Sequence, residues 1–183
     1  VTAGCYYNAA DGTDDNPSNV IDNDASTIWH SDWSSNSTHK LTDKSTDRHH
    51  ITLHFRNPED IKGFVYQARW YKTNNNWDKN GVLSRYTVVC ENKNGKEIYR
   101  KEKQSVGEEF TSSETRSIKF GETVENVSYM TIYFEETLGT GTPQYDNASC
   151  ASLDAIYADD DTTSVSVDVT INSMTASEFV GTY

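Results

Sequence analysis

The chain has 183 residues, a length that suits one well-buried domain and a short appendage. Its formal net charge of −12 would be repelled by phosphate backbones and anionic lipid surfaces, which argues against nucleic acid and against electrostatic docking to a membrane. A low aliphatic content with 11 Tyr and many Thr and Ser is typical of an antiparallel β protein. The acidic charge suits a secreted or cell-surface protein, and no apolar run reaches the length of a membrane span, so no membrane insertion is expected.

Short alternating segments separated by turn residues predict strands along most of the chain. The first strand is expected at residues 5–7, and residues 24–28 carry a single helical turn. A turn is predicted at residues 57–60, and Asn94 with Gly95 predicts a type I′ hairpin, which needs positive φ at both positions. The other expected strands cover residues 51–55, 61–69, 82–90, 96–101, 115–120, 127–135 and 149–158.

About eight short strands with almost no helix predict an all-β fold, a β-sandwich or jelly roll, over residues 1–158. Residues 159–183 break this pattern. They begin with an acidic linker, and residues 165–171 alternate again as an extra edge strand or the start of a following module. Because Val1 is not a native start residue, we expect the chain to be cut from a longer protein.

The three cysteines leave two alternatives open. A Cys5–Cys150 bridge would tie the terminal strands together, whereas three reduced thiols would need no partner. Cys90 ends the apolar alternation that starts at Tyr86, so it is expected in the core.

Residues 16–35 combine oxygen ligands, an imidazole and indole rings. Asp22, Asp24 and Thr27 bring hard oxygen donors into one short turn, as Ca²⁺ requires. The alternative is an Asx-turn in which Asp24 caps the short helical turn. His30 could hydrogen-bond an axial sugar hydroxyl and Trp33 could stack on a sugar ring; the alternative is a surface histidine and a half-buried tryptophan.

Further candidates stand where expected strands meet loops. Arg69 ends a strand, and its planar guanidinium suits vicinal sugar hydroxyls, the alternative being a surface ion pair. Trp77 lies in the polar loop that follows. Tyr145 and Asn147 lie in a Gly/Pro loop before the last strand, where an ordinary turn is the alternative.

Four motifs, in this order, resemble those of the F5/8 type C (discoidin-like) domains, and most of all the bacterial carbohydrate-binding modules of family 32. The motifs are NVIDNDASTIWHSDW at residues 19–33, YQAR at 66–69, NGV at 80–82 leading into YTV at 86–88, and ASLDAI at 151–156. The resemblance covers roughly residues 3–158. It implies a β-sandwich jelly roll appended to a secreted glycoside hydrolase, sialidase or mucin-degrading protease, which binds glycans without cleaving them.

The resemblance also implies a structural calcium ion. Its ligands would be Asp22, Asp24, Thr27, a carbonyl near Asn19 and a glutamate of the last strand. Here the simplest register puts Ala155 in place of that glutamate. Either the neighbouring Asp154 substitutes for it, or the calcium site is weakened.

The sugar site follows from the same resemblance. Galactose- and GalNAc-binding members carry His and Trp at the positions of His30 and Trp33, and an Arg at the strand end matching Arg69. The family often places an aromatic wall and a polar contact in the loop before the last strand, which assigns Tyr145 and Asn147. Of Trp70 and Trp77, one is expected to pack under the loop and the other to extend the platform, and Trp77 is taken as the site residue. Trp29 is assigned to the core.

The sequence therefore predicts a non-catalytic, monomeric module that recognises terminal galactose- or GalNAc-type sugars on host or mucin glycans and targets an attached secreted glycan-degrading enzyme. One alternative is a discoidin-type adhesion or membrane-binding domain, although the loops are acidic, polar and Trp-bearing rather than aliphatic or basic. A small glycosidase with paired carboxylates is less favoured. No serine-hydrolase constellation, metalloprotease motif or phosphate loop is present in the sequence.

Overall fold

A computed structural model of the chain describes residues 1–6, 15–24, 26–31, 49–69, 72–73, 76–77, 79–138 and 147–161. Across these residues the structure is almost entirely β, with two short 3₁₀ helices, η1 (Pro17–Ile21) and η2 (Ala158–Asp161). None of the described helices is long and apolar enough to span a bilayer. The strands are β1 (Thr2–Ala3), β2 (Trp29–His30), β3 (His50–Gln67), β4 (Lys72–Thr73), β5 (Asn76–Trp77), β6 (Leu83–Glu91), β7 (Glu97–Ser105), β8 (Thr115–Thr137), β9 (Ser149–Cys150) and β10 (Ser152–Tyr157).

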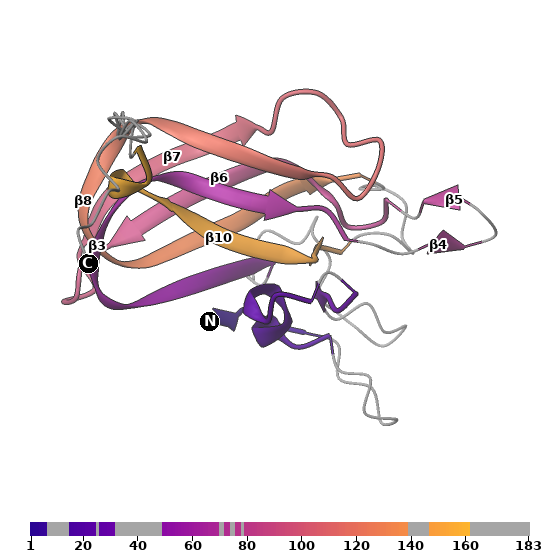
Figure 1. Ribbon diagram of the computed structural model, residues 1–183, viewed down its shortest axis with the longest axis horizontal. Coiled ribbons are helices and arrows are strands. Elements are labelled where there is room, and N and C mark those ends of the chain that lie inside the picture. Colours follow the sequence, from indigo (N-terminus) through magenta and orange to yellow (C-terminus); the bar gives the residue numbers. More distant parts are fainter. Residues whose placement is uncertain are drawn as a thin grey trace, which may run out of the picture.

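Two long, bent strands, β3 and β8, run through both layers of the sandwich. Residues 50–54 of β3 pair with residues 129–133 of β8, whereas residues 59–67 pair with residues 115–127, and the register shifts between the two blocks. The main sheet has the order β1-β3-β8-β6-β7, and β10 adds to the second half of β3. The ribbons of β3 and β8 curve round at one end of the molecule in Figure 1, so one antiparallel sheet folds back over itself.

The core lies between these two layers. Phe64, on the second half of β3, meets Tyr86 of β6 edge to face, with ring centroids 5.2 Å apart. Tyr66 meets Phe134 at 6.2 Å. Trp29 is fully buried, as predicted, and packs edge to face on Phe134 at 5.4 Å. Such pairs favour one relative placement of the layers, beyond the burial of their apolar area.

No disulfide joins any two of the three cysteines, so the structure has reduced thiols and not the Cys5–Cys150 bridge. Cys90 is buried in the core, as expected, and Cys150 is buried as well. Burial raises the pKa of the Cys90 thiol to about 12 and also raises that of Cys150. Both thiols therefore stay protonated at neutral pH and act as small apolar core groups.

Several predicted local elements are wrong in type or place. The first described strand is at Thr2–Ala3, and residues 5 and 6 of the predicted strand lie outside it, because the Cys5 carbonyl accepts the indole N–H of Trp29 at 3.0 Å instead of joining the ladder. The short helix is η1 rather than residues 24–28. There the Asn16 side chain caps the Ser18 N–H and Pro17 occupies the first turn, a combination that favours helix initiation.

The predicted break at residues 57–60 is also absent, since β3 is one continuous strand, and residues 115–120 and 127–135 likewise join within β8. The side chain of Asp60 accepts the Asn126 N–H at 2.9 Å, which ties the two strands at the bend. The hairpin between β6 and β7 is confirmed, but its turn is not type I′: Gly95 donates to the Asn92 carbonyl and alone has positive φ, at 72°.

The predicted polar loop at 70–81 contains the short antiparallel strand pair β4–β5. After β10 the chain forms η2, and residues 162–183, including the alternating segment at 165–171, lie outside the described residues.

The tight pairing of β3 with β8 predicts the effect of one substitution. A Cβ on Gly63 would lie 2.2 Å from the Ile118 carbonyl oxygen, so Gly63→Ala must push the strands apart. We expect its free energy of unfolding to fall by about 1–3 kcal/mol, measured by urea denaturation. Lys119→Ala is the matched control, because Lys119 is the exposed partner of Gly63 and its loss should change stability by less than about 0.5 kcal/mol. Equal stability of the two variants would contradict this account.

Candidate functional site

The short β2–β9 ladder closes one end of the sandwich. His30 pairs with Ser149 and Trp29 with Cys150. Ser31 extends the ladder, since its N–H donates to the Ala148 carbonyl and its hydroxyl accepts the Ala148 N–H, both at 2.9 Å. We call this region the β2–β9 end.

The segment before β6 is hydrogen-bonded to this ladder. Ser149 N–H donates to the Gly81 carbonyl at 2.8 Å, and the Ser149 hydroxyl donates to the Asn80 carbonyl at 3.0 Å. Gly81 N–H donates to the Leu138 carbonyl at 3.3 Å, where β8 has just ended. Segments that are far apart in the sequence therefore meet at the β2–β9 end.

His30 is held in a defined orientation there. Its side chain is 3% exposed, and its Nδ1 lies 2.7 Å from the Ser31 carbonyl oxygen. Because a carbonyl oxygen only accepts, Nδ1 must carry the hydrogen, and Nε2 of the neutral ring is then the acceptor. This tautomer suits an imidazole that accepts a hydrogen bond from a hydroxyl group.

Arg69 follows the end of β3 and reaches the same place. It is 7% exposed, and its Nη1 donates to the Asn80 carbonyl at 3.3 Å. That carbonyl also accepts the Ser149 hydroxyl, so Arg69 and the β2–β9 ladder share one acceptor. Arg69 is therefore buried rather than exposed at the surface, where the alternative interpretation of this residue would place it.

Asn147 completes the group. Its carbonyl accepts the Thr137 hydroxyl at 2.9 Å, and its side chain is 1% exposed. Within the described residues its Oδ1 has no hydrogen-bond donor. A Cβ on Gly81 would lie 2.6 Å from that oxygen, and Gly81 has a φ of 75°, so the close approach depends on glycine.

Tyr66 supports this arrangement from the core. Its hydroxyl donates to the Ser149 carbonyl at 2.9 Å and accepts the Leu83 N–H at 3.1 Å. Burial raises the pKa of Tyr66 well above its ordinary value, so the hydroxyl stays a neutral donor. Sequence reasoning missed the roles of Tyr66, Gly81 and Ser149. The one sequence signal was Asn80-Gly81 directly before a strand.

The structure thus brings together His30, Arg69 and Asn147 of the predicted sugar residues. Trp77 lies in β5, opposite Lys72 of β4. Trp33 and Tyr145 lie outside the described residues.

The predicted calcium ligands lie in the turn after η1. The Thr27 hydroxyl oxygen lies 2.8 Å from Asp22 Oδ2, 2.9 Å from the Asp24 carbonyl oxygen and 3.5 Å from the Asn19 carbonyl oxygen. The other Asp22 oxygen accepts the Asp24 N–H at 2.8 Å. One carboxylate, one hydroxyl and two carbonyls therefore gather here, and these are oxygen donors that Ca²⁺ accepts.

Two of the predicted carboxylate ligands have hydrogen-bond partners elsewhere. The Asp24 carboxylate accepts the N–H and hydroxyl of Ser26, and these hydrogen bonds lower the pKa of Asp24; its carbonyl, rather than its carboxylate, faces Thr27. Asp154 lies on the exposed side of β10 and accepts the Ala155 N–H at 2.8 Å. No group of three or more His, Cys, Asp or Glu side chains clusters for a metal among the described residues.

The fold is that of the family 32 carbohydrate-binding modules, as the sequence motifs predicted. A module from a family 31 glycoside hydrolase of Clostridium perfringens is 22% identical, with a TM-score of 0.62 over 86% of this chain and 88% of that one. A second C. perfringens module, in complex with GalNAc-β-1,3-galactose, is 20% identical with a TM-score of 0.60 over 85% and 92%. The module of C. perfringens NanJ, in complex with galactose, is 15% identical with a TM-score of 0.56 over 76% and 83%. No protein-family model and no curated protein matches the sequence.

The Tyr66 hydroxyl links the core to the candidate site, so its removal should lower the free energy of unfolding. Tyr66→Phe would leave the Ser149 carbonyl and the Leu83 N–H buried and unpaired, so we expect the free energy of unfolding to fall by about 1–3 kcal/mol in urea denaturation. Tyr99→Phe is the control, because the Tyr99 hydroxyl is buried without a hydrogen-bond partner in the described part of the chain. Its removal should be neutral or stabilising. A Tyr66→Phe variant as stable as Tyr99→Phe would show that the bridge contributes little.

Proposed function

We propose that this chain is a non-catalytic carbohydrate-binding module that binds a terminal galactose- or GalNAc-type sugar at the β2–β9 end. The observation that carries the proposal is the convergence of His30, Arg69 and Asn147, which come from three separate parts of the sequence. The fold, shared with the modules described above, supports it.

The chemistry of these groups suits a polyol. The guanidinium of Arg69 donates, Nε2 of His30 accepts, and the Asn147 amide can do both. Their backbone and side-chain contacts hold them in place before any ligand arrives, which lowers the entropy cost of binding. In this proposal Trp33, Trp77 and Tyr145 supply the flat apolar surface on which the sugar ring stacks.

A glycosidase is disfavoured as the alternative. Glycoside hydrolysis needs two carboxyl groups on either side of one bond. The side chains that meet at the β2–β9 end, among the described residues, are an imidazole, a guanidinium, an amide and hydroxyls. This set can bind and orient a sugar.

The proposed role is to concentrate an attached enzyme on its substrate. A small polar site buries little surface and should bind one sugar weakly. Tethering converts weak binding into a high effective concentration of glycan around a linked catalytic domain, without new contacts. We propose a secreted or cell-surface setting on host or mucin glycans for this reason.

The site is tested by substitution and a glycan array. We expect the wild-type chain to bind galactose- or GalNAc-terminated glycans, and His30→Ala, Trp33→Ala and Arg69→Ala each to lose at least about tenfold in affinity, because each removes a directed contact. Arg100→Ala is the control, since Arg100 pairs with Glu97 on the exposed side of β7.

Because Arg69 is buried, Arg69→Lys serves as a second variant that keeps the charge but loses the planar fork. It should fold, as judged by its melting temperature, and still bind poorly. Full binding by all three alanine variants would place the sugar elsewhere, and no binding of any galactose- or GalNAc-terminated glycan by the wild-type chain would refute the specificity.

We further propose that the turn after η1 holds a structural calcium ion. Asp22, the Thr27 hydroxyl and the carbonyls of Asn19 and Asp24 would be the protein ligands, because their oxygens already converge. Asp154 remains a candidate ligand from β10. When bound, the ion would replace the hydrogen bonds of the turn with stronger ionic contacts.

The calcium proposal predicts a chelator effect. Removal of calcium with EDTA should lower the melting temperature, and excess Ca²⁺ should restore it, because a ligand that binds only the folded state stabilises it. Asp22→Asn should weaken the response, whereas Asp159→Asn in η2 should not. An unchanged melting temperature in EDTA would refute a structural ion.

A further inference from the structure

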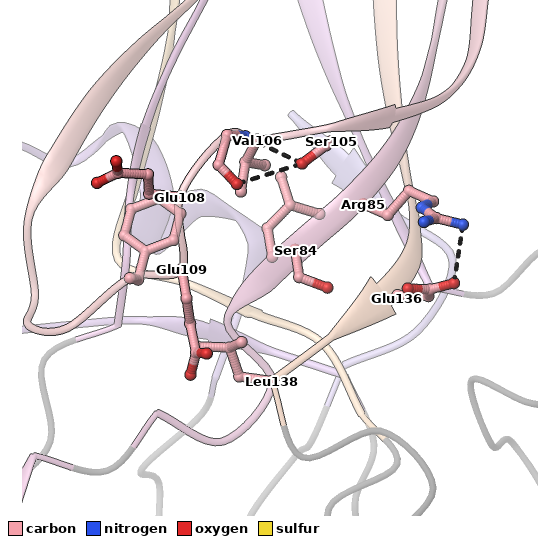
Figure 2. Close-up of a pocket in the computed structure, with 11 residues that line it drawn as sticks. Ser84, Arg85, Ser105, Val106, Glu108, Glu109, Glu136 and Leu138 are labelled. Atoms are coloured by element: carbon pink, nitrogen blue, oxygen red, sulfur yellow. Dashed lines mark hydrogen bonds and ion pairs between the residues drawn. The ribbon is translucent and has the colours of Figure 1, made fainter.

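A cavity of about 240 Å³ lies beside the β2–β9 end, between the start of β6, the end of β8 and the segment that follows β7. Figure 2 shows the side chains that line it, with Arg85 and Glu136 on one side and Glu108 and Glu109 on the other. It is open to solvent, and no residue of the candidate sugar site described above lines it.

The walls of the cavity differ in chemistry. Leu83, Val106 and Leu138 line it with apolar surface. On one side of the cavity (Figure 2), the Arg85 guanidinium and the Glu136 carboxylate form an ion pair at 3.1 Å, and both side chains are about half exposed, at 45% and 50%. Apolar surface together with paired donors and acceptors in one cavity suits the two aspects of a sugar ring, its C–H face and its hydroxyl rim.

The segment after β7 is fixed rather than loose. Ser105 and Gly107 exchange hydrogen bonds through the Ser105 hydroxyl, as drawn in Figure 2. Val106 N–H donates to the Ser84 carbonyl at 3.1 Å, and Arg116 covers the Phe110 ring with its Cζ 3.8 Å from the centroid. The cavity is therefore preformed.

Its walls connect directly to the candidate sugar site. Leu138 N–H donates to the Val82 carbonyl at 2.8 Å, and the Leu138 carbonyl accepts the Gly81 N–H. Thr137, next to Leu138, donates to the Asn147 carbonyl. Lys79 pairs with Glu109 at 2.8 Å, which joins the segment before Gly81 to the cavity rim.

We propose that this cavity is a subsite for a second sugar unit of the same glycan, and that this unit is neutral. The proposal rests on the proposed function, because the terminal sugar occupies the β2–β9 end. Three carboxylates, Glu108, Glu109 and Glu136, line the cavity with a single guanidinium, and the whole chain carries a charge of −12. A sulfate or carboxylate on the second sugar would be repelled.

Calorimetry with defined sugars tests the subsite. The probes are galactose, GalNAc, the disaccharides in which each is linked to GlcNAc, and the same disaccharides with a sulfate on the GlcNAc. We expect a neutral disaccharide to bind about tenfold more tightly than its terminal monosaccharide, since it adds charge-assisted hydrogen bonds. The sulfated form should lose that gain.

Arg85→Ala and Glu136→Ala should remove the disaccharide gain and leave the affinity for the monosaccharide unchanged. Their half-exposed ion pair contributes little to stability, so both variants should fold. Arg100→Ala, which breaks a comparable exposed pair with Glu97 outside the cavity, is the control and should keep the gain.

The outcomes separate the two proposals. If no probe binds the wild-type chain, the proposed function fails and the subsite with it. If a monosaccharide binds but its disaccharide binds no more tightly, or the gain survives in Arg85→Ala and Glu136→Ala, the subsite alone is refuted.

Discussion

The rest of the molecule depends on the two hydrogen bonds made by the Tyr66 hydroxyl. It is buried in the core, yet it bridges the Ser149 carbonyl and the Leu83 N–H, the two backbone groups that begin β9 and β6. A hydrogen bond this deep is strong because water does not compete for it. The aromatic core therefore sets the position of the backbone around which His30, Arg69 and Asn147 gather.

The bends in β3 and β8 explain why these residues meet at all. Since each strand runs through both layers, it begins and ends at the same end of the sandwich. Arg69 lies just past the end of β3, and Thr137 is the last residue of β8. The fold thus gathers loops from across the chain at one place, and loops on a rigid scaffold are where binding sites usually form.

Burial fixes the orientation of the side chains at the candidate site. His30, Arg69 and Asn147 are each less than a tenth exposed, so the surrounding backbone rather than solvent decides their orientation. Such side chains lose little freedom when a ligand binds, which matters most where few contacts are made. The neighbouring cavity differs, because its Arg85–Glu136 pair is half exposed and open to exchange with a ligand.

Alternation of apolar residues was enough to predict an all-β sandwich, most strand cores and the burial of Cys90, because the period of a strand is local. The burial of Trp29 was predicted from the family resemblance. The family resemblance, rather than residue types alone, singled out His30, Arg69 and Asn147, and their role in sugar binding stays a prediction. The sequence could not show that β3 and β8 bend without breaking, since the register shifts are stabilised by partners across the sheet. Nor could it show Tyr66 beneath Ser149 or Gly81 against Asn147, because these contacts join residues that only the folded sandwich brings together.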